Sequence, residues 1–74
     1  MKSLDKLKIG DKAIVSYIEN VEVKRRFLEI GLVSGIQVEC ILESPFRNPK
    51  AYFIKGASIA IRNEDAKHVM VDVI

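Results

Sequence analysis

One segment, residues 20–35, has the pattern of a short amphipathic α-helix that stops at Gly31, followed by a second glycine turn at Gly35. The other segments of the chain have the patterns of short β-strands. Asn20 is placed to cap this helix, because its side-chain oxygen can accept a free backbone N–H of the first turn. Val23, Phe27 and Ile30 recur at helical spacing, so they are predicted to share one buried face. The chain must therefore bury its apolar residues in a small β-structure into which this one helix is inserted.

The length of the chain limits the size of that structure. With 74 residues it is predicted to form a single domain over 1–74 with a small core. Hydrophobic residues make up 49% of the chain, which is enough to fold without disulfides. A net charge of +2 is too small to indicate nucleic-acid binding by itself, so no nucleic-acid partner is predicted.

The sequence shows no targeting signal. No run of about 18 apolar residues predicts a membrane span, and the first residues lack the apolar core of a signal peptide. No membrane insertion and no secretion are therefore predicted. The single cysteine, Cys40, cannot form an internal disulfide and lies in a strand pattern, so it is predicted to be a core residue in a reducing compartment.

The segments before and after the helix predict the first strands of an antiparallel sheet. Leu4 and Leu7 can lie on one side of a short helical turn that closes one end of a barrel. Residues 13–18 are apolar almost throughout, which predicts a strand buried on both faces. Residues 36–43 alternate strictly, which predicts a half-buried strand. Its predicted inward residues are Ile36, Val38, Cys40 and Leu42, with Ile41 as the apolar residue on the outer face.

The C-terminal half predicts three more strands. Residues 51–54 and 57–62 flank a Lys55-Gly56 turn and are predicted to form a hairpin. Asn63 is predicted to cap a helical turn before a last strand, 68–73. The predicted inward residues of that strand are Val69, Val71 and Val73. We therefore predict a mainly β fold, a small barrel of about five antiparallel strands with one inserted short α-helix and an N-terminal helical turn.

No set of residues indicates catalysis. The chain has one histidine, one cysteine and no glycine-rich phosphate loop, so no enzyme activity and no cofactor are predicted. Glu64, Asp65 and His68 are the nearest approach to a metal site, since oxygen and imidazole ligands suit a transition metal. These residues are predicted to form a solvated capping turn instead, because a durable site needs further ligands.

Two groups of residues are candidates for contact with a partner. Lys24, Arg25 and Arg26 form a basic cluster on the helix, and Arg26 can pair with Glu22 or Glu29 along the helix. The alternative is that the cluster contacts an acidic partner, since exposed ion pairs add little stability.

The second group lies in the proline-containing loop, residues 44–50. There Phe46, beside Arg47, has no alternation to bury it. It is either folded back onto the barrel or kept for a partner.

The order of the motifs along the chain resembles the FeoA family, the small cytoplasmic proteins of bacterial ferrous iron uptake. An L-x-x-L-x-x-G start is followed by R-F-x-E-I-G-L-x-x-G over residues 26–35, then by the Gly56 turn and I-A-I-R at 59–62. The residues that carry the motifs are Leu4, Leu7, Gly10, Phe27, Glu29, Gly31, Leu32, Gly35 and Gly56. The family often has a glycine-rich stretch in the loop where this chain has Phe46, Arg47 and Asn48.

The resemblance implies a cytoplasmic SH3-like barrel without catalysis. It also implies that the protein acts on FeoB, a membrane permease whose cytoplasmic part is a GTP-binding domain. The contact would then be made by Lys24, Arg25, Arg26, Phe46 and Arg47. A second expected contact is self-association through an outward apolar residue such as Ile41. The alternatives are an accessory domain of a metal-dependent transcriptional regulator, a nucleic-acid-binding barrel, and a module for proline-rich peptides, for which five aromatic residues and no tryptophan are few.

Overall fold

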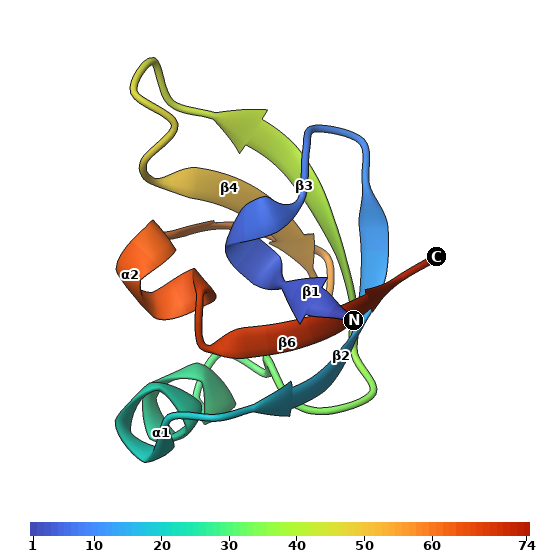
Figure 1. Cartoon of the computed structure of the whole chain (residues 1–74), viewed down its shortest axis with the longest axis vertical. Coiled ribbons are helices and arrows are strands. Elements are labelled where there is room, and N and C mark those ends of the chain that lie inside the picture. Colours follow the sequence, from blue (N-terminus) through green and yellow to red (C-terminus); the bar gives the residue numbers. More distant parts are fainter.

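The computed structural model describes residues 1–74 as one curled antiparallel sheet of six strands in the order β1-β6-β2-β3-β4-β5 (Figure 1). The strands are β1 (Lys2–Ser3), β2 (Lys12–Ile18), β3 (Gln37–Glu43), β4 (Lys50–Ile54), β5 (Ala57–Ile61) and β6 (Val69–Val73). The helices are α1 (Val21–Leu28), α2 (Asn63–Ala66) and a 3-10 turn, η1 (Leu4–Lys6). The predicted mainly β barrel with one inserted helix is confirmed, and β1 adds a strand that the sequence pattern did not predict. Neither α-helix has the length and apolar character to span a bilayer.

The core is a single cluster of 15 buried residues inside the curl of the sheet. Leu4 and Leu7 are fully buried in it, and η1 lies across the mouth of the barrel between β4 and β6 (Figure 1). The prediction that Leu4 and Leu7 close one end of the barrel is therefore confirmed. The other members are Ala13, Val15, Val23, Phe27, Leu32, Val38, Cys40, Tyr52, Ile54, Ile61, Ala66, Val69 and Val71.

A buried lysine attaches η1 to the sheet. Lys50, the first residue of β4, is almost fully enclosed, and its Nζ donates to the backbone oxygens of Asp5 at 2.6 Å and Leu7 at 2.9 Å. Glu43 Oε1 lies 3.8 Å from the same nitrogen and supplies a counter-charge. Carbonyl groups at the end of η1, which have no helical partner, are thereby satisfied inside the protein.

Tyr52 makes a second attachment to η1, and it makes stability depend on pH. Its hydroxyl is buried and donates to Leu4 O at 3.3 Å, and burial raises the pKa of the phenol well above its ordinary value of 10. Above pH 10 the unfolded chain can ionise this group while the folded chain cannot, so folding becomes less favourable by about 1.4 kcal/mol per pH unit. Below pH 10 both states keep the phenol neutral and the effect vanishes.

We expect urea denaturation to show this loss between pH 9 and pH 11, when the wild type is compared with Tyr52→Phe. The wild type should lose about 1 kcal/mol more than the variant over this interval, because only the wild type has the buried phenol. The comparison cancels the titration of lysines, which both proteins share. Equal losses in the two proteins would contradict the assignment.

Helix α1 begins as predicted and ends earlier than predicted. Asn20 Oδ1 accepts the Val23 N–H at 3.1 Å, which confirms the N-cap. Val23 and Phe27 are buried, but Ile30 is not part of the core, so its predicted place on the buried face is wrong. The backbone leaves the helix after Leu28, and the N–H of Leu32 returns to Phe27 O at 3.0 Å, which puts the Leu32 side chain in the core instead.

The predicted inward faces of two strands are partly wrong. In β2 only alternate residues, Ala13 and Val15, are fully buried, because α1 lies beyond the end of the strand and does not cover its outer face (Figure 1). In β3 the register shifts between Cys40, which is opposite Tyr52, and Leu42. This bulge turns Leu42 outward, and its side chain is 60% exposed.

The C-terminal half agrees with the predicted hairpin and differs at two residues. Lys55 and Gly56 both have positive φ angles, 49° and 83°, as a tight two-residue hairpin requires. Asn63 is not the cap of α2 but its first residue, and Arg62 holds the cap position without a side-chain hydrogen bond. Val73 is exposed, because the end of β6 extends past the core.

Candidate functional site

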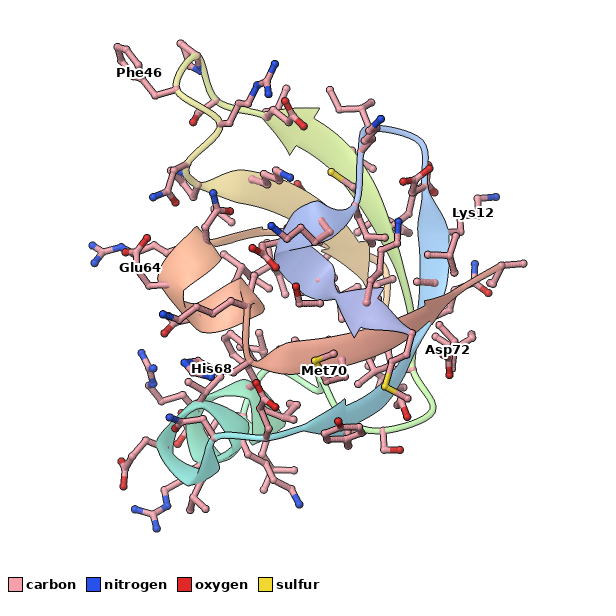
Figure 2. All side chains as sticks on the ribbon, viewed as in Figure 1. Lys12, Phe46, Glu64, His68, Met70 and Asp72 are labelled. Carbon is pink, nitrogen blue, oxygen red and sulfur yellow. The ribbon has the colours of Figure 1, made fainter.

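The structure does not bring the five predicted contact residues together. Figure 1 shows α1, which carries Lys24, Arg25 and Arg26, at one end of the longest axis. The loop over residues 44–49, which carries Phe46 and Arg47, lies at the opposite end (Figures 1 and 2). The principal extents are 29 × 23 × 23 Å, so these are two separate surfaces and not one.

A groove of about 390 Å³ lies between α1, the end of β2 and the turn that follows α1. We call it the α1–β2 groove and define it by six of its lining residues: Tyr17, Ile18, Lys24, Arg25, Leu28 and Val33. Leu28 is 63% exposed although it is a large apolar residue, and Tyr17 is half-exposed beside it. Ser34 Oγ donates to Ser16 O at 2.7 Å, which fixes the turn against β2. An apolar surface in a fixed concave setting is the usual form of a binding site.

The basic residues of α1 have different roles. Arg26 Nη2 lies 2.9 Å from Asp65 Oδ1 of α2, so the predicted pairing with Glu22 or Glu29 is wrong. The side of α1 that carries Arg26 faces α2, which is a tertiary relation that the helix sequence does not contain. Arg25 is 4.0 Å from Glu22, both being largely exposed, and Lys24 makes no ion pair. Lys24 and Arg25 therefore give one rim of the α1–β2 groove a positive charge.

The opposite end is an ordered loop with an exposed aromatic residue. Phe46 is 90% exposed, so it does not fold back onto the barrel. The loop is held by Asn48, whose Nδ2 donates to Glu64 Oε1 at 2.9 Å and whose Oδ1 accepts the Asn63 N–H at 3.0 Å. Asn63 Nδ2 in turn donates to Arg47 O at 2.9 Å. The hydrogen bond from Asn48 also lowers the pKa of the Glu64 carboxyl group.

The residues considered for a metal site are dispersed. Glu64 is bound to Asn48, whereas His68 Nδ1 lies 3.9 Å from Glu19 Oε1, and Figure 2 shows Glu64 and His68 at separate places. No group of three or more His, Cys, Asp or Glu side chains comes together anywhere in residues 1–74. Cys40 is buried and burial raises the pKa of its thiol, which disfavours the reactive thiolate.

Sequence reasoning missed the two apolar residues that shape the α1–β2 groove. Leu28 follows Phe27 directly, so it cannot lie on the same face of the helix, and an apolar residue on the polar face was a usable signal. Tyr17 lies in β2 between the half-buried residues Ser16 and Ile18. The near-continuous apolar pattern of residues 13–18 predicted burial on both faces of the strand, so it gave no sign that Tyr17 is exposed.

Comparisons with known proteins match the chain to one protein family. The family model described as the FeoA domain matches residues 2–73. The Fe(2+) transport protein A/Fe(2+) transporter FeoB fusion protein of Porphyromonas gingivalis is 33% identical over 72 residues. That match covers 96% of this chain and 8% of the fusion protein, so the chain spans only a small part of that relative.

Solved structures share the fold. The NMR structure of a FeoA-like protein from Clostridium acetobutylicum superimposes with a TM-score of 0.92 at 27% identity, covering 99% of this chain and 86% of the other. The crystal structure of Stenotrophomonas maltophilia FeoA complexed with zinc, described as a prokaryotic SH3 domain protein, has a TM-score of 0.84 at 26% identity. Its coverage is 97% of this chain and 91% of the other. The predicted SH3-like barrel is confirmed.

Proposed function

This chain belongs to the FeoA domain family, and on that premise we propose that it is a ferrous iron transport accessory protein that docks on the cytoplasmic side of a FeoB-type permease. The observation that carries the proposal is the fusion relative, in which a FeoA part and a FeoB part share one polypeptide. A covalent link of this kind holds two partners at high effective concentration and favours a contact between them.

The α1–β2 groove supplies the contact in this proposal. Its apolar lining offers the exposed side chains of Leu28 and Tyr17 to an apolar side chain of the partner, and burial of one such side chain contributes about 1.5–3 kcal/mol. Lys24 and Arg25 on the rim favour acidic neighbours of that anchor. The expected occupant is thus a permease segment that carries a large apolar residue next to Asp or Glu. Charge on the rim would chiefly raise the association rate and select the partner.

The proposed action is a shift in the permease's conformational equilibrium and not a chemical step. A docked module changes transport or nucleotide turnover only if it binds one permease state more tightly than another. The barrel suits this role because its groove is built from a helix and a strand held by the core. Nothing in its geometry groups a nucleophile with a base and an orienting residue, so the proposal assigns it no catalysis.

We expect Leu28→Lys to weaken binding to the purified cytoplasmic part of the permease by at least about tenfold, because it places a charge in the apolar lining of the groove. The pair Lys24→Glu with Arg25→Glu should lower the association rate and remove most of its salt dependence. Both can be measured by surface-immobilised binding at two salt concentrations.

The matched control changes the opposite end of the molecule. Phe46→Ser and Arg47→Glu lie outside the α1–β2 groove and should leave this affinity unaltered. Wild-type affinity in Leu28→Lys, with normal folding by circular dichroism, would show that the partner does not use the groove. No binding of the wild type under any nucleotide condition would contradict the docking proposal itself.

A further inference from the structure

The end of the molecule opposite α1 carries three exposed large apolar side chains on three neighbouring segments (Figure 1). Ile9, Leu42 and Phe46 are exposed by 60%, 60% and 90%. The N–H of Gly10 donates to Cys40 O at 2.8 Å, which continues the pairing of the two chain segments beyond β2 and brings the turn with Ile9 beside the end of β3. The loop with Phe46 follows β3 directly, and Figure 2 shows Phe46 pointing away from the barrel. We call these three residues the apolar tip.

Basic side chains accompany the apolar tip. Lys8 and Arg47 line a shallow hollow together with Ile9 and Glu43. The nearby acidic groups are engaged, since Asp11 accepts the backbone N–H of Lys8 at 2.9 Å and Glu43 lies within 4 Å of two cations. By contrast, Lys8 makes no ion pair, and the Arg47 side chain is 83% exposed. Around the hollow, the cations Lys8 and Arg47 are therefore more available to solvent than the anions Asp11 and Glu43.

The shape of the apolar tip decides what kind of partner it suits. Its members stand on a turn, a strand end and a loop, and of the three only Ile9 lines the shallow hollow. The Asn48 and Asn63 hydrogen bonds hold the loop, so the backbone that carries Phe46 is already ordered before binding. Protruding apolar side chains beside cations suit a bilayer interface, where each inserts separately and the cations meet lipid phosphates.

A second copy of this chain is a poorer occupant. The apolar recess large enough to receive Phe46 is the α1–β2 groove, and its rim carries Lys24 and Arg25. Arg47, next to Phe46, would then approach like charges, which is unfavourable.

We propose that the apolar tip is a peripheral membrane-contact surface that rests on anionic lipid, with Ile9, Leu42 and Phe46 entering the headgroup layer and Lys8 and Arg47 facing the phosphates. The contact needs no permease and does not rest on the docking proposal. Such a contact would orient the protein on the membrane, with the apolar tip on the bilayer and α1 pointing away from it.

The test is co-sedimentation with vesicles of phosphatidylglycerol and phosphatidylethanolamine, against vesicles of phosphatidylcholine alone. We expect the wild type to bind the anionic vesicles, to bind the neutral ones far less, and to be released by 0.5 M salt, a concentration that screens the headgroup charge. Lys8→Glu with Arg47→Glu should lower the partition coefficient at least about 25-fold, because each cation near such a surface is worth about fivefold. Phe46→Ser should lower it about tenfold.

The matched controls make the same chemical changes at the other end. Lys24→Glu with Arg25→Glu removes the same charge, and Leu28→Ser removes an exposed apolar side chain. Because α1 lies at the far end of a 29 Å axis and the Debye length is about 8 Å, both should bind vesicles like the wild type. Three results would overturn the proposal: no binding of the wild type to anionic vesicles, equal losses in tip and control variants, or a soluble oligomer that Phe46→Ser dissociates while vesicle binding is absent.

Discussion

Replacing Lys50 with methionine is expected to lower the free energy of unfolding by about 3 kcal/mol. Methionine keeps most of the side-chain volume and removes the ammonium group. The oxygens of Asp5 and Leu7 then lose their donor while η1 still covers the core, and Glu43 loses a counter-charge at 3.8 Å. A buried acceptor without a partner carries its full desolvation cost, so the loss exceeds what an exposed ion pair would contribute.

Urea denaturation at pH 7 measures this loss, with Lys67→Met as the control. Lys67 follows α2 and is exposed, so the same change of residue type there should alter stability by less than about 0.5 kcal/mol. A domain of this size has a total stability of only about 4–11 kcal/mol, so Lys50→Met should also lower the melting temperature by more than about 10 °C. Similar small effects in both variants would mean that water replaces the ammonium group at no cost.

The second large effect is expected for Phe27→Ala, at about 3–4 kcal/mol. Helix α1 has eight residues and only two buried ones, Val23 and Phe27, so it depends on these contacts and not on its own propensity. Losing the phenyl ring leaves a cavity at the base of α1, and the α1–β2 groove should lose its order along with the helix.

The neighbouring Leu28→Ala is the control for Phe27→Ala, because Leu28 is largely exposed and its loss should cost less than about 0.5 kcal/mol. Amide hydrogen exchange reports the local part of the effect, since protection in α1 should fall more than protection in β3 and β4. Unchanged protection in α1 would show that Val23 and the Arg26–Asp65 pair hold the helix without Phe27.

The elements that the sequence predicted well depend on neighbours along the chain. The Asn20 cap, the two-residue turn at Lys55-Gly56 and the burial of Leu4 and Leu7 each follow from residue types within a few positions of one another. Such local rules hold because the cap, the positive φ angles and the helical turn are decided by the backbone of the same segment.

What the sequence did not predict depends on contacts between distant segments. Arg26 pairs with Asp65, 39 residues away, where the helix alone offered Glu22 and Glu29. Asn48 and Asn63 hold the loop and α2 together over 15 residues. The α1–β2 groove likewise exists only because the end of β2 and the polar face of α1 meet. The five predicted contact residues fell into two sets for the same reason, since sequence order says nothing of which end of a barrel a loop occupies.

The bulge after Cys40 has a consequence for probing and comparing such chains. At this point β3 holds one residue more than β4. Even-numbered side chains of β3 therefore point inward before the bulge and outward after it. A relative without the extra residue would show an inverted inside–outside pattern from here onward, so an alignment gap belongs at Ile41. A fluorophore attached at Leu42 would report on solvent, whereas one at Cys40 would disrupt the interior.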